Sequence, residues 1–453
     1  MGLISRIFRL GKGASKSLPD QCEYAKWNKD QLINKIIELE GMNKRKAEDG
    51  DEREGQVSKK QKHSKNEVKK RKKKDRTFDF SKYNTRFVAL RFAYLGWNYN
   101  GLAIQKEPTP LPTVEGTILE AMNACKLVPS MTPQEYNFSR CGRTDKGVSA
   151  MNQVISLRVR SNLTDQEQQD KSNDDKEINY VHILNQILPD DIRVSAVCLR
   201  PPKNFDARFS CEYRHYRYLF HSSGLNIERM QEAAQLYLGE HDFRNFCKLD
   251  GSKQITNYKR TIKQSCIIKL NEEVFCLDLI GSAFLWHQVR CMMANLFLVG
   301  QELEKPSVIS EMLNVEKVRQ KPIYDMASDV PLILYDCSFP DMEWSHVMPN
   351  EFKSLQSNRR IYSLALDYKL KSTISDIFAN VLSVSHNDLC GKVRINLGDG
   401  KGKVVTVYEE MLKRNVMDSV DTVNQKFQRR KTQKKKNNAN TNDTHLQGHP
   451  EEI

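Results

Sequence analysis

The stretch Ser139-Arg-Cys-Gly-Arg-Thr-Asp-Lys-Gly-Val-Ser-Ala150 holds a glycine-bracketed turn, and it leads into Gln153–Arg160, whose apolar residues alternate. Such alternation predicts a half-buried strand. The turn therefore lies between secondary-structure elements, where a side chain is held rigidly yet stays exposed. Asp145 sits between Gly142 and Gly147, and glycines on both sides allow a sharp turn and the close approach of a bulky molecule. By itself the pattern is also that of an ordinary Asp-containing turn.

The segments around this turn alternate between strand and helix patterns. Strands are predicted where apolar and aromatic residues cluster or alternate, and helices where apolar residues recur at three-and-four spacing. Asn162–Glu177 is polar and predicts a loop insertion. The predicted strands are Phe87–Tyr94, Ile192–Leu199, Tyr213–Phe220, Ile262–Leu270, Val274–Ile280 and Val330–Cys337, and the predicted helices are Thr113–Leu127, Ile178–Leu188, Asn226–Leu238 and Leu285–Val299. Strands, hairpins and helices mixed in this way predict an α+β fold.

Both flanks of this region are strongly charged. Lys and Arg number 71 against 57 Asp and Glu, which gives a formal charge of +14 and favours polyanionic partners such as nucleic acid. A short amphipathic helix is predicted over residues 30–40, and Gly41–Arg76, with six consecutive cations at Lys69–Lys74, predicts a disordered linker. Gln428–Asn442 predicts a disordered basic tail for the same reason. These basic segments are compatible with a nuclear-import signal, with an RNA-binding arm, or with a solvated tail that has no function.

Several classes of protein are disfavoured by the composition. The 11 cysteines form no Cys-x-x-Cys pair and are odd in number, so we expect reduced thiols and neither a zinc site nor a disulfide framework. No apolar run approaches ~18 residues, so a membrane span is not expected. Arg6, Arg9, Lys12 and Lys16 precede the first acid and resemble a mitochondrial presequence.

Two later segments also place charged or aromatic residues where chemistry is possible. Asn204–Phe220 interleaves aromatic and Arg residues, a pattern typical of base stacking and phosphate binding but also of cross-strand aromatic pairs. In Ser282–Ala294, Arg290 lies in an otherwise core-like helix, so it either has a carboxylate partner or faces solvent. His287 is equally compatible with a structural and a catalytic role. Leu397–Lys403 lacks the spacing of a phosphate-binding loop, and we interpret it as a flexible basic turn.

These segments, in this order, resemble the TruA family of tRNA pseudouridine synthases. The family's Gly-Arg-Thr-Asp-x-Gly-Val signature is matched by Gly142–Val148. Its Phe-x-Ala-Arg-x-Ser motif followed by Arg-x-Tyr-x-Tyr is matched within Phe205–Tyr218, and its Ala-Phe-x-x-x-x-Val-Arg motif by Ala283–Arg290. Tyr94–Gln105 departs from the bacterial form and looks like the eukaryotic branch that modifies positions 38 and 39 of the anticodon arm.

The resemblance implies a fold, a division into parts and a set of site residues. It implies two related lobes of mostly antiparallel sheet flanked by helices, with a catalytic cleft between them, and a homodimer. The expected parts are residues 1–80, an N-terminal lobe over 81–201, a C-terminal lobe over 202–340 and an extension over 341–453. Asp145 is implied as the essential carboxylate, Tyr216 as the residue that packs on the target base, Arg290 as the partner of Asp145, and Arg143 as a residue that holds the flipped nucleotide.

The implied reaction needs a nucleophile and no cofactor. Pseudouridine forms when the C1′–N1 bond of uridine breaks and the uracil rejoins through C5, so one ionised carboxylate suffices. Asp145 would attack C1′ or promote glycal formation by taking the 2′ proton, and the sequence leaves both routes open. Two rival hypotheses are a non-catalytic tRNA-binding or chaperone protein on the same scaffold, and a nuclear scaffold acting through its tails. We expect nuclear and cytoplasmic localisation, with a mitochondrial pool also considered.

Overall fold

The computed structural model describes residues 78–346, 352–382 and 392–444, so the helix predicted at 30–40 and the predicted linker Gly41–Arg76 lie outside the described residues. The described residues belong to one unit, Thr77–Ile453. No helix among them has both the length and the apolar character needed to cross a bilayer. Short 3-10 turns are η1 (Phe80–Lys82), η2 (Gly96–Asn98), η3 (Pro133–Tyr136), η4 (Glu167–Gln169), η5 (Lys171–Lys176), η6 (Arg244–Phe246), η7 (Gly251–Lys253) and η8 (Met411–Lys413).

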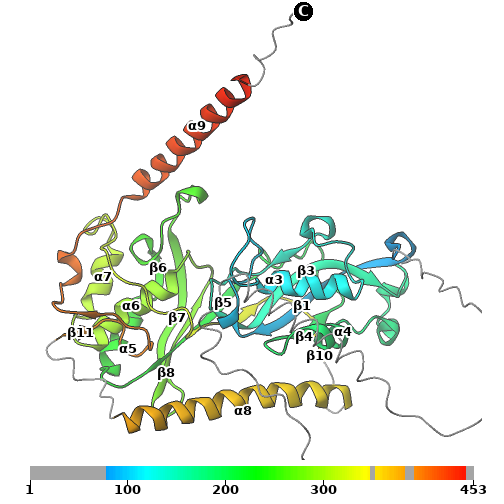
Figure 1. Cartoon of the computed structure of the whole chain (residues 1–453), viewed down its shortest axis with the longest axis horizontal. Coiled ribbons are helices and arrows are strands. Elements are labelled where there is room, and N and C mark those ends of the chain that lie inside the picture. Colours follow the sequence, from blue (N-terminus) through cyan, green and yellow to red (C-terminus); the bar gives the residue numbers. More distant parts are fainter. Residues whose placement is uncertain (1–77, 347–351, 383–391, 445–453) are drawn as a thin grey trace, which may run out of the picture. The chain divides into compact units, whose positions relative to one another are not determined.

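The N-terminal half of the chain builds one side of a large sheet (Figure 1). The strand predicted at Phe87–Tyr94 is central in this half and pairs antiparallel with a neighbour on each side. Thr113 caps the first helix as expected, because its hydroxyl accepts a hydrogen bond from the Gly116 N–H at 3.2 Å. The elements are β1 (Asn84–Tyr94), α3 (Val114–Ala124), β2 (Ser139–Arg140), β3 (Ser149–Ser161), α4 (Tyr180–Ile187) and β4 (Ile192–Cys198). Buried side chains of α3 and α4 join those of β1, β3 and β4 in one hydrophobic core.

The second half builds the other side of the sheet around the hairpin that the sequence predicted. Its elements are β5 (Tyr213–His221), α5 (Ile227–Gln235), β6 (Gly239–Asp242), β7 (Lys259–Lys269), β8 (Val274–Gly281), α6 (Gln288–Gly300), α7 (Ser307–Leu313) and β9 (Leu332–Ser338). Helix α6 is apolar almost throughout because nearly all its residues are buried in a second core. The buried side chains of these strands and helices form this second core and exclude water from it.

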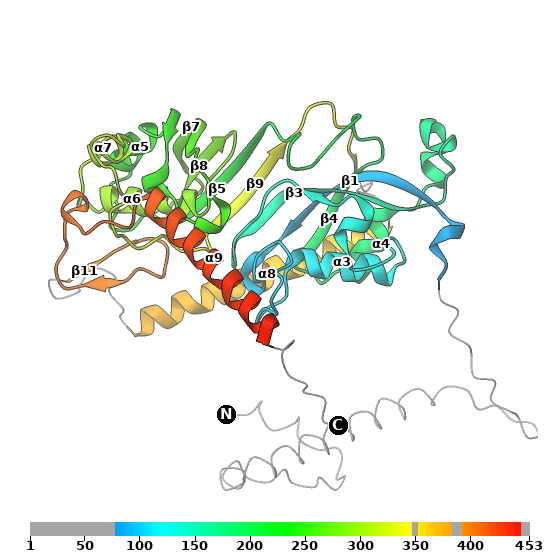
Figure 2. The same ribbon diagram turned by 90° about the horizontal axis from the view of Figure 1, so that it is seen from above.

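One continuous sheet joins the two halves (Figure 2). Its order is β10-β4-β1-β3-β9-β5-β8-β7-β6, with β2 paired to β3. The strand pairs of this sheet are antiparallel in the described residues, except that β3 and β9 run parallel and pair Ser149 with Ile333 and Ala150 with Leu334. This junction begins four residues after Asp145. The predicted α+β class with mostly antiparallel strands is confirmed, whereas the boundary at 201/202 stays a prediction.

The extension after the sheet is more ordered than composition predicted. It holds β10 (Ser345–His346), α8 (Phe352–Val381), the two-stranded β11 (Val393–Arg394) and β12 (Val404–Val405), and α9 (Val420–Thr444). The prediction of disorder over Gln428–Asn442 is therefore wrong for these residues. The segment lacks Gly and Pro and is rich in Gln, Lys and Arg, which are good helix formers. Tertiary contact anchors its start, since Gln428 donates to the Gln254 side chain at 2.8 Å.

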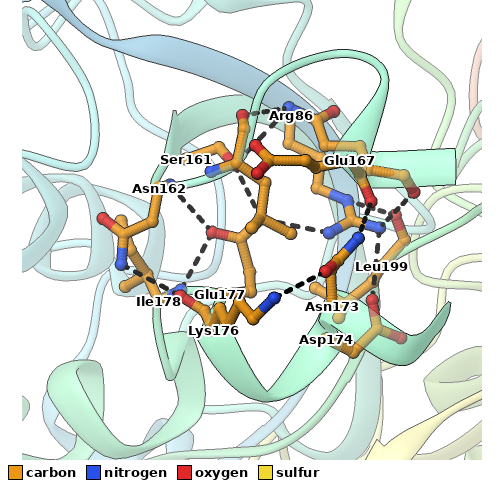
Figure 3. Close-up of polar contacts among 12 residues, drawn as sticks. Arg86, Ser161, Asn162, Glu167, Asn173, Asp174, Lys176, Glu177, Ile178 and Leu199 are labelled. Carbon is orange, nitrogen blue, oxygen red and sulfur yellow. Dashed lines mark hydrogen bonds and ion pairs between the residues drawn. The ribbon is translucent and has the colours of Figure 1, made fainter. Parts of the chain in front are cut away.

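The polar insertion predicted over Asn162–Glu177 is fixed by a buried ion pair (Figure 3). Arg86 of β1 donates to Glu177 at 3.0 Å, and the two side chains are only 3% and 1% exposed. Arg86 also donates to the Gln168 carbonyl, which ties the insertion to the sheet. Composition predicted the loop correctly, but only the fold shows what holds it.

Candidate active site

The turn that carries Asp145 connects β2 to β3, and its shape depends on glycines. Gly147 has φ +81°, and a Cβ there would lie 2.4 Å from an oxygen of Asp329. Gly101 has φ +91°, and a Cβ there would lie 2.8 Å from the Thr144 carbonyl oxygen. Larger residues would therefore strain the backbone and displace the turn. A Cβ at Gly142 would meet no atom within 4 Å, so that side of the turn is open.

The carboxylate of Asp145 contacts two consecutive residues at the start of α6. Its Oδ1 accepts a hydrogen bond from the indole Nε1–H of Trp286 at 3.1 Å. Its Oδ2 lies 3.4 Å from Nε2 of His287, and the Asp145 side chain keeps 29% of its exposure. His287 precedes α6 with φ +61°, a left-handed conformation that is uncommon for a non-glycine residue. Asp145 is therefore withdrawn from water but still reachable.

The electrostatic balance at Asp145 favours a more basic carboxylate than usual. Burial raises its pKa, and the nearby charge of Asp329 adds to that rise. The positive charge of Arg290 and the Trp286 hydrogen bond oppose the rise without cancelling it. Burial and neighbouring cations lower the pKa of His287 to about 4. His287 is therefore neutral at pH 7, and its contact with Asp145 is not an ion pair.

Arg290 acts on Asp145 through its charge rather than through contact. Its Nε donates to the Ala327 carbonyl at 2.8 Å, and among the described residues it forms no direct ion pair with Asp145. Its charge nevertheless lowers the pKa of Asp145, and it also opposes the burial that raises the pKa of Asp399. The guanidinium thus donates to a backbone carbonyl while its charge acts on Asp145, and the pairing that the resemblance implied stays a prediction.

Tyr216 lies close to Asp145, whereas Arg143 faces solvent. Tyr216 occupies the middle of β5, packs edge-on against Phe284 with ring centroids 4.9 Å apart, and contacts both hydrophobic cores. Burial raises the pKa of its hydroxyl, and the charge of Asp145 adds to that rise. Arg143 is exposed. The base-packing role of Tyr216 and the nucleotide-holding role of Arg143 stay predictions.

The structure adds residues that the sequence reasoning did not select. Trp286 lay inside a segment already chosen for Arg290, so its proximity to a chosen residue was a usable signal. Lys248 lies 4.8 Å from the Trp286 ring centroid, but nothing local in the sequence marks it. Among the described residues, no group of three or more His, Cys, Asp and Glu side chains is arranged to hold a metal ion.

The segment interpreted as a flexible basic turn, Leu397–Lys403, is packed beside this site. Asp399 accepts a hydrogen bond from the Ser328 N–H at 2.8 Å. Lys401 lies 3.8 Å from Asp329, the same carboxylate that contacts the Gly147 turn. Gly398 has φ +103°. The segment is a turn with exposed lysines, and tertiary contacts that spacing does not reveal join it to the site; its flexibility stays a prediction.

Fold and site together define an α+β protein with a recessed carboxylate of raised pKa, Asp145, beside the junction of two sheet halves. Residues 233–340 match the family model described as tRNA pseudouridine synthase. The chain is 60% identical over 415 residues to the "tRNA pseudouridine(38/39) synthase" of Saccharomyces cerevisiae, a match that covers 91% of this chain and 93% of that relative. It is 49% identical to the protein of that name from Mus musculus, over 59% of each chain. The chain belongs to the tRNA pseudouridine synthase family.

A more distant relative by sequence agrees with this assignment. The "tRNA pseudouridine synthase A" of Methanosarcina mazei is 32% identical over 53% of this chain and 81% of its own length. A solved structure titled "Crystal structure of pseudouridylate synthase" aligns with 60% of this chain and 74% of its own, at 12% identity and a TM-score of 0.22.

Proposed function

We propose that this protein isomerises uridine to pseudouridine in tRNA, at positions 38 and 39 of the anticodon arm, and that Asp145 is the essential carboxylate. The observation that carries the proposal is the recessed Asp145 carboxylate beside Trp286, His287 and the charge of Arg290. The yeast and mouse relatives named for positions 38/39 support the substrate and the target positions.

The reaction balances without a redox step. The C1′–N1 bond of uridine breaks, a C1′–C5 bond forms, the hydrogen on C5 leaves as a proton, and N1 gains a proton. Asp145 either bonds C1′ and is later displaced, or takes the 2′ proton to give a glycal. Both routes need the carboxylate charged at neutral pH, and the positive charge of Arg290 opposes protonation there.

Access to the target base requires that the uridine leave its stack, which costs a few kcal/mol. Tyr216, partly buried beside Asp145, is suited to offset this by stacking at about 1–3 kcal/mol per base. Exposed cations next to the carboxylate, namely Arg143, Lys146, Lys248 and Lys401, supply charge for neighbouring phosphates. Such contacts position the nucleic acid without reading its sequence.

The test compares Asp145→Asn with wild type in release of tritium from tRNA labelled at C5 of uridine. We expect the variant to bind tRNA and release no tritium above background. Asp325→Asn is the matched control, because Asp325 is an exposed carboxylate 58% open to solvent that pairs with Lys403 rather than with the site. If wild type binds tRNA without releasing tritium, the non-catalytic binding protein replaces this proposal.

We also propose a homodimer, and the exposed apolar face of α8 supports it. Five large side chains at four-residue spacing are between 43% and 70% exposed there: Tyr362, Leu366, Leu370, Ile374 and Phe378. Such a continuous apolar stripe marks an interaction surface. Sedimentation equilibrium should give a dimer for wild type and a monomer for the double variant Leu370→Glu, Ile374→Glu. Lys369→Glu on the same helix is the control, and a monomeric wild type would refute the dimer.

For localisation we propose the nucleus and cytoplasm, with a mitochondrial pool. The run Lys69–Lys74 supports nuclear import, and the basic, acid-free start of the chain supports the mitochondrial pool. A fluorescent fusion that lacks residues 1–80 should lose nuclear accumulation. If the truncated fusion is distributed like the full chain, the N-terminal region does not direct localisation.

A further inference from the structure

Trp286 has no part in the reaction as proposed above, yet it makes the shortest contact to the carboxylate. Its indole N–H donates to Asp145 Oδ1 at 3.1 Å, and its side chain remains 42% exposed. The Lys248 ammonium lies 4.8 Å from its ring centroid, and the ring of His287 lies 4.6 Å away. The backbone is fixed as well, because the Lys248 N–H donates to the Trp286 carbonyl at 3.0 Å.

The two oxygens of Asp145 are therefore not equivalent. Oδ1 accepts a hydrogen bond of ordinary length from Trp286. Within the part of the chain that the structure describes, Oδ2 accepts no hydrogen bond of ordinary length: it lies 3.4 Å from Nε2 of His287, beyond the usual 2.7–3.2 Å of an N–H···O bond. Oδ2 is thus the oxygen with free lone pairs.

We propose that Trp286 is a positioning residue for Asp145, which holds Oδ1 through its indole N–H so that Oδ2 is presented to the ribose. Lys248 supports this arrangement by resting on the indole and fixing its backbone. This inference rests on the proposed function and adds the assignment of one oxygen to the reaction. It agrees with the direction of the electrostatics, because the Trp286 hydrogen bond and the Lys248 charge both lower the pKa of Asp145.

The indole suits this role better than a guanidinium would. Arginine presents parallel N–H groups that bind both oxygens of a carboxylate at once. The indole has one N–H donor and no acceptor, so it can occupy one oxygen only. Arg290 is directed to the Ala327 carbonyl and acts through space, which leaves Oδ2 unoccupied while its charge still favours ionisation.

The experiment uses the full-length protein with Trp286→Phe, which keeps an aromatic ring and removes the N–H. We expect kcat for tritium release to fall about 10- to 100-fold, the range for losing one hydrogen bond to a charged group. KM for tRNA should change less than about threefold, and the acid limb of the kcat profile should move to higher pH. Trp344→Phe is the matched control, since Trp344 packs under Arg91 in the first half of the sheet. Thermal unfolding of each variant accounts for any loss of folded protein.

A second variant, Lys248→Met, separates charge from shape. It keeps the alkyl chain on the indole and removes the ammonium, so kcat should fall less than in Trp286→Phe while the acid limb moves in the same direction. The other titratable or charged groups that act on Asp145 or lie against it are Arg290, Asp329, His287 and Tyr216. These are unchanged in both variants.

A fluorescence titration tests the contact without turnover. The chain has 4 tryptophans, and a variant with phenylalanine at Trp27, Trp97 and Trp344 retains Trp286 alone. Its emission should titrate with the ionisation of Asp145, and the titration should vanish when Asp145→Asn is added. Unchanged kcat and acid limb in Trp286→Phe, or a titration that survives Asp145→Asn, would overturn the inference. A wild type that releases no tritium would instead refute the proposed function.

Discussion

Glu177 and Asp145 are both withdrawn from solvent, yet their surroundings shift their pKa values in opposite directions. Burial alone would raise the pKa of Glu177, but donors from Ser161, Ile178, Asn162 and Arg86 outweigh it, and the pKa lies below its usual value (Figure 3). At Asp145 burial also raises the pKa, and the Arg290 charge with a single hydrogen bond from Trp286 only partly offsets it.

The difference teaches what separates a supporting site from a reactive one. Glu177 accepts four hydrogen bonds of 2.7–3.1 Å, two at each oxygen, so no lone pair is left for a ligand. Asp145 keeps one oxygen without an ordinary hydrogen bond. A saturated carboxylate stabilises the fold, whereas an under-coordinated one is available for chemistry at some cost to stability.

The largest expected effect is on turnover in Asp145→Asn. We expect kcat to fall at least about 10⁴-fold, equivalent to about 5.4 kcal/mol, because a nucleophile is lost. The thermal unfolding midpoint at pH 7 should stay the same or rise, because the amide carries no charge to desolvate. Single-turnover assays and calorimetry on the same preparation measure both. A marked fall in the midpoint would mean that Asp145 supports the fold as Glu177 does.

The next effect is on stability in Glu177→Gln. The amide cannot accept from all four donors, and Arg86 loses its buried partner, so the free energy of unfolding should fall by about 3–5 kcal/mol. Denaturant titration measures this, and kcat per folded molecule should be unchanged. Glu167→Gln in the same insertion is the control, because Glu167 is exposed. Equal stability of the two variants would contradict the importance of the buried network.

Arg290→Ala should impair turnover more than folding. Loss of the charge that favours ionised Asp145 should lower kcat about 10- to 100-fold, or about 1.4–2.8 kcal/mol, and move the acid limb to higher pH. Arg290→Lys keeps the charge and should recover part of the activity. An Arg290→Ala protein that is fully active but readily unfolded would show that Arg290 is a structural residue.

The smallest effect is the pH dependence of stability. The folded-state pKa of Asp145 is raised, so its contribution to stability is present below its unfolded pKa and is lost as pH rises through the folded pKa. The pKa of Glu177 is lowered, so its contribution is present above its unfolded pKa and is lost as pH falls through the folded pKa. The change in unfolding midpoint relative to wild type should therefore be positive for Asp145→Asn and negative for Glu177→Gln at pH 7. Both differences should shrink on acidification, and equal signs at pH 7 would refute the comparison.

Much of the fold could be predicted because its signals are local. Alternation in Gln153–Arg160 and the hairpin around Asn271–Glu273 predicted strands that the structure contains as β3, β7 and β8. The helix over Gln428–Asn442 was missed because its charge suggested disorder, whereas its anchor is the distant Gln254. A contact between residues 174 positions apart does not change the hydrophobic periodicity of either segment, so the sequence pattern does not predict it.

The sequence also predicted some residues of the candidate site and missed others. Asp145, Tyr216 and Arg290 were selected because their motifs occur in a recognisable order, and the structure brings all three within electrostatic reach. Lys248 and Asp399 were missed because each belongs to a loop with no motif of its own. The pairing of Arg290 with Asp145 stays a prediction: the charge of Arg290 lowers the pKa of Asp145, while its Nε donates to the Ala327 carbonyl.

The sequence by itself selected the candidate for the reactive group, since the glycine-bracketed Asp145 and the two later motifs occur in the order that the family resemblance requires. The tertiary structure decided how that carboxylate is tuned. The parallel pairing of β3 with β9 places the Asp145 turn beside the start of α6, where Trp286 takes one oxygen and leaves the other open. Burial, hydrogen bonding and charge depend on distances between segments far apart in the chain, so the pKa of Asp145 follows from the fold and not from its neighbours in sequence.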